Sequence, residues 1–275
     1  MIMNNIYKVR KKWRDLTVYR QSLGVGPAGT DKVSLVIYLD YEREFAVEEA
    51  RHSAEKGFNS ILDILCKYNI KATWNCVGLI GEYYPETIKS LIEKDQEVTS
   101  HTYSHIVPLR TNRSVLMNDI SQAKEFFQNE FNINMRGFHS PQDAWSKPLL
   151  EILANLDFDY DIAVEGNKLK HNASYISSLK YKIFNIGKGI IRIPSFSDDW
   201  RLISEKLLPE KMLQHWKMAI GQFYFGKTIA VGFHPWVIGQ DDARIDAFET
   251  FIKTVASSKD VTTYTGCEIA KWYSK

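Results

Sequence analysis

The chain has 275 residues, of which 44% are hydrophobic and 25% are charged, and its formal net charge is +2. This length suffices for one large domain or two small ones, and the small net charge gives no electrostatic case for a nucleic-acid partner. No apolar stretch approaches the roughly 20 residues that a membrane-spanning helix needs.

The first 32 residues form a separate N-terminal arm that is basic near its start. It lacks the apolar segment of a secretory signal, so we expect a cytoplasmic protein. The basic residues can contact an anionic membrane surface, or the arm can simply be solvated. These basic residues, with one tryptophan among them, are Lys8, Arg10, Lys11, Lys12, Arg14 and Trp13.

The three cysteines have no disulfide or metal-type spacing and are expected to be reduced thiols. They are Cys66, Cys76 and Cys267.

From residue 33 to the C-terminus, strand-like and helix-like segments alternate. Apolar, β-branched runs occur at 33–39, 71–78, 97–100, 135–139, 160–164, 190–194 and 228–236. Several stretches between them carry apolar residues at three- and four-residue spacing, which is typical of amphipathic helices. Near the end, 244–258 is predicted as a helix, 260–265 as a short strand and 266–275 as a terminal helix, whereas 166–189 breaks the rhythm as an insertion or irregular hairpin. The alternation predicts an α/β protein whose single domain, 33–275, is a barrel of seven to eight parallel strands.

Ionisable side chains follow four of these predicted strands. Asp40, His101, His139 and His234 each lie at or just past a strand end. Catalytic residues of parallel α/β folds collect at the carboxyl ends of the strands. The sequence therefore predicts one catalytic mouth assembled from distant parts of the chain.

The motif "SHTYSH" places His101 and His105 four residues apart. Together with Asp40 or Glu42, they supply the mixed nitrogen and oxygen ligands that zinc accepts, with a position left for water. Asp40 and Glu42 point to the same face of a strand, so one can bind metal while the other takes a proton from water. Alternatively, the histidines cap a helix at the surface and the acids are solvated charges.

His234 ends the run "TIAVGFHPW" and is a candidate general acid, or else a buried histidine of the core. Either Asp198 or Asp199 can orient its imidazole, and both can instead cap the following helix. His139 can be catalytic or structural. Three tryptophans near the same mouth can stack on a sugar ring or belong to the core: Trp145, Trp200 and Trp236.

Four segments, "KATWNCVG", "QEVTSHTYSH", "RGFHSP" and "VGFHPWVIGQDDARIDAFETFI", follow the strand-end acids in order. Together they resemble the polysaccharide deacetylase family (NodB homology, carbohydrate esterase family 4), nearer its peptidoglycan deacetylase and allantoinase-like branch. The resemblance runs from about Val33 to the C-terminus and implies a distorted, TIM-like (β/α) barrel.

The resemblance also implies a role for each matching residue. Asp40 is the general base, and a divalent metal, expected to be zinc, is held by Glu42, His101 and His105. The backbone N–H of Gln142 helps to hold the oxyanion. His234, oriented by Asp199, protonates the departing amine.

Three positions depart from the family pattern. "YLDYERE" replaces "TFDDG", so the second acid lies one residue further on and is a glutamate. Gln142 replaces a common tyrosine, and His139 replaces an arginine that steadies the base. Since histidine lacks the permanent charge and forked donors of arginine, we expect Asp40 to be less firmly held and to have a higher pKa, or His139 to serve another substrate.

These patterns lead to three functional predictions. The first is a metal-dependent hydrolase that removes an acetyl or formyl group from an amino sugar of a nucleotide- or lipid-linked glycan precursor. The second is a metal-independent hydrolase of cyclic amides or ureides, as in the allantoinase-like members. The third, motivated by His139, is a catalytically weakened glycan-binding protein.

Overall fold

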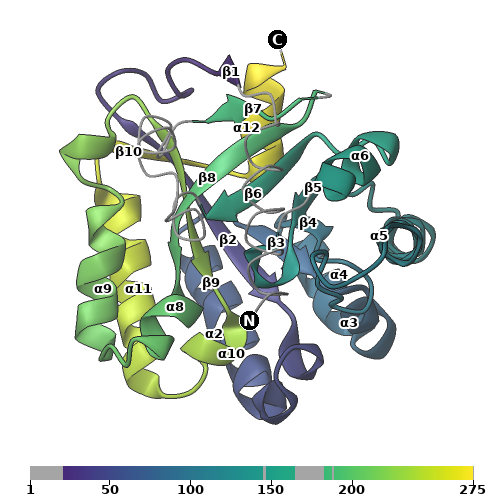
Figure 1. The fold of residues 1–275 in the computed structure, drawn as a ribbon. Coiled ribbons are helices and arrows are strands. Elements are labelled where there is room, and N and C mark those ends of the chain that lie inside the picture. Colours follow the sequence, from purple (N-terminus) through teal and green to yellow (C-terminus); the bar gives the residue numbers. More distant parts are fainter. Residues whose placement is uncertain (1–20, 145–146, 165–182, 188, 275) are drawn as a thin grey trace, which may run out of the picture.

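The apolar runs form the strands of a closed barrel in the computed structural model, which describes residues 21–144, 147–164, 183–187 and 189–274 (Figure 1). Seven parallel strands follow one another around the barrel, and β9 closes it by pairing with both β8 and β2. In order around the barrel they are β2 (Val33–Tyr41), β3 (Thr73–Cys76), β4 (Glu97–Ser100), β5 (Gly137–His139), β6 (Tyr160–Val164), β8 (Ile191–Asp198) and β9 (Thr228–Phe233). Each overlaps a run predicted from the sequence, and the predicted α/β barrel is confirmed.

Three short strands extend the sheet outside the barrel. The predicted strand near the C-terminus is β10 (Val261–Tyr264), which pairs in parallel with β2. β7 (Phe184–Asn185) is antiparallel to both β8 and β1 (Gln21–Ser22). Most of the predicted insertion 166–189 lies outside the described residues, as do residues 1–20 of the predicted arm.

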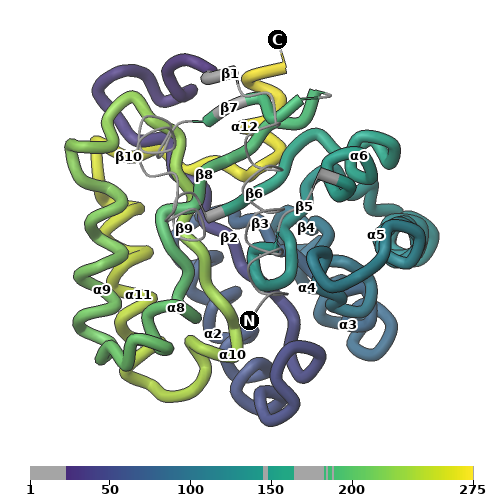
Figure 2. The backbone as a smooth tube through the Cα atoms, viewed as in Figure 1, coloured from purple at the N-terminus to yellow at the C-terminus, as the bar shows by residue number. Residues whose placement is uncertain are grey.

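Helices pack around the barrel, with α9 and α11 side by side on one flank and α3, α4 and α5 on the opposite flank (Figures 1 and 2). The α-helices are α2 (Arg51–Lys67), α3 (Gly78–Tyr83), α4 (Pro85–Glu93), α5 (Arg113–Phe131), α6 (Lys147–Asn155), α8 (Asp199–Ser204), α9 (Pro209–Met218), α10 (Pro235–Ile238), α11 (Asp242–Ser257) and α12 (Gly266–Tyr273). The described segments also contain the short 3-10 helices η1 (Arg43–Phe45), η2 (Glu48–Ala50), η3 (Pro141–Asp143) and η4 (Gln222–Tyr224). Within the described part of the chain, no helix is both long and apolar enough to cross a membrane.

Side chains of β2 alternate between the outside and the inside of the barrel. Leu35, Ile37 and Leu39 belong to the large core beneath the helices, whereas Val36 and Tyr38 belong to a second cluster that includes residues of β6, β8 and α12. Because successive side chains of a strand point to opposite faces, Asp40 lies on the same side as Tyr38. The two-residue period therefore turns an acid toward the barrel axis at the carboxyl end of β2.

Candidate active site and metal centre

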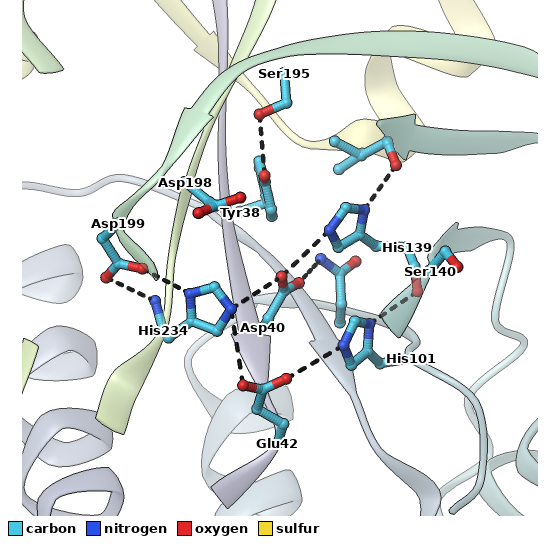
Figure 3. Close-up of polar contacts among 12 residues, drawn as sticks. Tyr38, Asp40, Glu42, His101, His139, Ser140, Ser195, Asp198, Asp199 and His234 are labelled. Atoms are coloured by element: carbon cyan, nitrogen blue, oxygen red, sulfur yellow. Dashed lines mark hydrogen bonds and ion pairs between the residues drawn. The ribbon is translucent and has the colours of Figure 1, made fainter. Parts of the chain in front are cut away.

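A cavity of about 570 Å³ opens where the barrel strands end. Its wall brings together, as predicted, the acids and histidines at or just past the ends of four separate strands. They are Asp40, Glu42, His101, His105, His139 and His234. The close-up shows most of them converging on the two carboxylates after β2 (Figure 3).

Three of these residues form a group with the composition of a metal site. Glu42 Oε2 lies 3.0 Å from His105 Nε2 and 3.5 Å from His101 Nε2, and one ligand atom from each residue lies within 4.8 Å of the others. Burial raises the pKa of the Glu42 carboxyl, but the neighbouring imidazoles, with His234 the strongest, outweigh burial. They hold this pKa well below its usual range. The carboxylate is therefore ionised at neutral pH, which is the form that binds a cation.

The surroundings of the two histidines fit a bound cation. His101 Nδ1 lies 2.8 Å from the backbone carbonyl of His139, so Nδ1 carries the proton and Nε2 presents its lone pair to the site. Burial lowers the pKa of His101, which favours the neutral imidazole. The buried His105 Nε2 faces Glu42 Oε2 at 3.0 Å, and His105 takes a left-handed backbone conformation, φ 58°. An imidazole nitrogen that faces a carboxylate oxygen of the same group, on a strained backbone, is typical of a ligand site.

Asp40 is held by two side chains from other strands. Asn75 Nδ2 donates to Asp40 Oδ1 at 2.7 Å, and His139 Nε2 lies 3.3 Å from Asp40 Oδ2. Burial alone raises the pKa of this carboxyl, but His139 and then His101 outweigh it and lower the pKa to about 2. The expectation that Asp40 is poorly fixed and has a higher pKa is therefore wrong.

The His139 imidazole carries a positive charge, as an arginine would, because its pKa is raised. Burial lowers the pKa of the imidazole, but Asp40 overcomes this and raises it to about 9. Its second nitrogen, Nδ1, lies 2.7 Å from the carbonyl of Ile162, so both ring nitrogens face acceptors. The imidazole is a cation at neutral pH, supplied by the fold rather than by the residue type.

Asn75 was not identified from the sequence as a functional residue. It is completely buried, and its Oδ1 accepts from the Thr99 hydroxyl at 3.1 Å. A signal was present, because a polar amide stands between Trp74 and Cys76 in the predicted strand "KATWNCVG". Nothing local, however, indicates that this amide reaches Asp40.

The two acids of "SFSDDW" have separate roles. Asp199 is fully buried; its Oδ1 lies 2.6 Å from His234 Nδ1, and its Oδ2 accepts from the His234 backbone N–H at 2.9 Å. Asp198 instead caps α8, accepting from the backbone N–H of Arg201 at 2.8 Å. The structure thus places one acid on the imidazole and the other at the helix end, so each of the two readings left open by the sequence holds for one residue.

The ion pair with Asp199 keeps His234 protonated. Burial lowers the pKa of this imidazole, but Asp199 and then Glu42 raise it well above the ordinary histidine value. His234 Nε2 faces the cavity at 3.5 Å from Asp40 Oδ2. A charged donor and an ionised carboxylate therefore stand side by side at the mouth (Figure 3).

The remaining predicted site residues occupy different positions. Trp200 lines the cavity and is 54% exposed. Trp236 also lines it but is 7% exposed, and its indole N–H donates to Glu42 Oε1 at 2.9 Å. Gln142 lines the wall in a left-handed conformation, φ 55°. Trp145 lies outside the described residues.

Residues 45–160 match the family model for polysaccharide deacetylase. A 68-residue segment, 25% of the chain, is 29% identical to a peptidoglycan-N-acetylglucosamine deacetylase of Bacillus cereus. A 120-residue segment, 44% of the chain, is 26% identical to a peptidoglycan deacetylase of Helicobacter pylori. These matches span 32% and 39% of the two relatives. The resemblance indicated by the sequence motifs is confirmed.

Solved structures share the whole fold. A protein of Mycobacterium smegmatis, described as a polysaccharide deacetylase, superposes with a TM-score of 0.77 at 18% identity, over 93% of this chain and 94% of that one. The allantoinase PuuE superposes with a TM-score of 0.72 at 17% identity, over 88% of this chain and 90% of that one. At these identities the likeness establishes the distorted barrel and nothing about the reaction.

Proposed function

We propose that the chain is a metal-dependent hydrolase that removes an acetyl or formyl group from an amino sugar, since residues 45–160 match the family model for polysaccharide deacetylase. One observation carries the proposal. The acid–histidine group Glu42, His101 and His105 lies beside a second ionised acid, Asp40, and a protonated histidine, His234, in a single cavity. That set holds a ligand group, a base and an acid, which amide hydrolysis requires.

Glu42, His101 and His105 would hold a divalent cation, and we propose zinc because two imidazoles and one carboxylate are a ligand set that it accepts. When bound, the cation supplies a Lewis acid that polarises the acyl oxygen and lowers the pKa of water. The protein contributes ligand orientation, since the contact of His101 Nδ1 with the His139 carbonyl fixes which nitrogen faces the site.

Asp40 and His234 divide the proton transfers. We assign the base to Asp40, because its pKa of about 2 keeps it ionised, and it takes the proton of the attacking water. We assign the acid to His234, whose raised pKa keeps it protonated, and it gives its proton to the departing amine nitrogen. Environments that push two pKa values apart at one site are the usual basis for such an assignment.

Gln142 and Trp200 both line the cavity and would both contact the substrate. The left-handed backbone at Gln142, directly after Pro141, supports its N–H as the oxyanion donor. The exposed face of Trp200 suits stacking on a sugar ring. We propose a nucleotide- or lipid-linked glycan precursor in the cytoplasm, in keeping with three free cysteines.

Acetate or formate release by the full chain tests this proposal. N-acylated sugars linked to a nucleotide, to a lipid pyrophosphate and within peptidoglycan fragments are compared, each with added zinc and after removal of metal by chelation. Zinc-dependent release from a precursor supports the proposal. Hydrolysis of allantoin by the chelated protein, without release from any amino sugar, contradicts it and favours the metal-independent hydrolase. Inertness with every substrate and metal favours the glycan-binding protein.

Contact of the basic arm with a membrane is a further part of the proposal, because a lipid-linked substrate lies at an anionic surface. Co-sedimentation with anionic and with neutral vesicles tests it. Equal recovery with both kinds of vesicle contradicts a role for the arm.

A further inference from the structure

Trp236 turns its polar edge toward the metal group rather than toward the open cavity. The ring is 7% exposed, and its Nε1–H donates to Glu42 Oε1 at 2.9 Å. The two residues are 194 positions apart, so the contact exists only in the folded barrel. A sugar-stacking role would need an accessible ring face, and Trp200, at 54% exposed, has one in the same cavity.

The two oxygens of Glu42 face different partners. Oε1 accepts the indole hydrogen bond and lies 3.8 Å from His234 Nε2, whereas Oε2 faces His105 at 3.0 Å and His101 at 3.5 Å. A carboxylate whose one oxygen is engaged by a buried donor presents the other oxygen to a cation. The glutamate side chain also has one more rotatable bond than an aspartate, and the indole removes part of that freedom.

We propose that Trp236 is a positioning residue that holds Glu42 in a one-oxygen, Oε2-only geometry and so sets the metal affinity of the site. The inference rests on the proposed metal site. Hydrogen-bond partners of ligating carboxylates typically contribute 10- to 100-fold to metal affinity.

Close backbone packing explains how the indole reaches Glu42. Trp236 lies on α10, which directly follows His234 and packs against α2. A Cβ at Gly57 on α2 would lie 1.8 Å from the carbonyl oxygen of Pro235, and a Cβ at Gly239 would lie 1.9 Å from that of Ser53. Only glycine permits this approach, so the helix pair fixes the height of Trp236 above the strand ends.

Zinc titration of the metal-free full chain in chelator-buffered solution tests the inference. Trp236→Phe keeps an aromatic ring and removes the N–H donor, and we expect its zinc Kd to rise about 10- to 100-fold. Trp200→Phe is the matched control, since this ring lines the same cavity and it is the Trp236 indole that donates to Glu42, and we expect its zinc Kd to stay at the wild-type value. A wild-type Kd in Trp236→Phe overturns the inference. Failure of the wild type itself to bind zinc contradicts the proposed function instead.

Two measurements separate positioning from mere folding support. X-ray absorption of the zinc-loaded proteins reports the number of oxygen ligands, and we expect one more in Trp236→Phe because Glu42 becomes free to bind through both oxygens. In the wild type, the Trp236 indole N–H is expected to exchange slowly by NMR with and without zinc, which requires no variant. Fast exchange in the zinc-loaded wild type overturns the inference, even if Trp236→Phe does not fold.

Discussion

Asp40 and Glu42 at the open end of the barrel and Glu97 at its closed end have pKa values that shift in opposite directions. At the open end, the pKa of Asp40 falls to about 2 and that of Glu42 falls well below its usual range. At the closed end, covered by α12, burial raises the pKa of Glu97. All three residues belong to, or directly follow, strands of the same barrel.

For these three carboxyls the difference lies in the charge of the partners, not in the number of hydrogen bonds; at Asp199, also at the open end, burial outweighs the His234 cation and raises the pKa to about 6. Glu97 accepts from the hydroxyls of Thr73 and Tyr160, each at 2.7 Å, and from the backbone N–H of Cys267 at 3.1 Å. These donors are neutral and do not overcome the effect of burial. The open end supplies imidazolium cations, and a nearby opposite charge favours the ionised carboxylate more strongly. At the closed end, Glu97 is held by neutral hydrogen bonds within the fold. At the open end, the imidazolium cations keep Asp40 and Glu42 ionised, which is the form that the proposed chemistry needs.

The largest effect should come from removing the base at the open end. Asp40→Asn keeps the size of the side chain and removes its charge, and we expect kcat to fall about 10²- to 10⁴-fold. Zinc content should stay at the wild-type level, because the proposed ligands are Glu42, His101 and His105. Kinetics and metal analysis of one preparation check both points. Loss of zinc in this variant would show that Asp40, not Glu42, is the ligand.

The next effect should come from the acid that orients His234. Asp199→Asn removes the charge that raises the pKa of His234, so the imidazole loses its proton at a lower pH. We expect kcat to fall about 100-fold, with the alkaline limb of the pH profile moving to lower pH. Asp198→Asn is the matched control, because asparagine caps a helix as well as aspartate does. Equal losses in the two variants would argue against a special role for Asp199.

A smaller effect is expected from the cation that replaces the family arginine. His139→Gln removes the ion pair with Asp40, and a hydrogen bond to a charged group is worth about 1.5–3 kcal/mol. We expect kcat to fall about tenfold or more, whereas His139→Arg, which restores a permanent charge, should retain more activity than His139→Gln. Steady-state kinetics of the two variants at one pH give the comparison. A gain of activity only in His139→Arg, from an inert wild type, would favour the weakened glycan-binding protein.

The smallest effect on catalysis should come from the closed end. A carboxyl whose pKa in the folded state is raised contributes stability that is present below its unfolded pKa, 4.5 here, and is lost as pH rises through the folded value. Glu97→Gln cannot ionise, so this fall of the unfolding free energy with rising pH should disappear, while zinc affinity and kcat stay near wild type. Urea unfolding at several pH values above 4.5 measures the slope. An unchanged slope would show that Glu97 is not the group responsible.

Much of the fold could be predicted because its signals are local. Seven apolar, β-branched runs became the seven barrel strands, and the two-residue period placed Asp40 on the inner side of β2. The acids and histidines at strand ends were identifiable because parallel strands deliver their carboxyl ends to one face. Their convergence followed from chain order and periodicity.

The roles of individual side chains depended on contacts between distant residues. Residue patterns alone did not distinguish Asp198 from Asp199, and only the family resemblance favoured Asp199; the sequence also gave His139 no charge and grouped Trp236 with the sugar-stacking aromatics. The structure placed Asp199 on His234, His139 beside Asp40, and the Trp236 indole on Glu42. Protonation states and hydrogen-bond partners depend on distances of a few ångströms between strands far apart in the chain, and these distances are set only when the barrel closes.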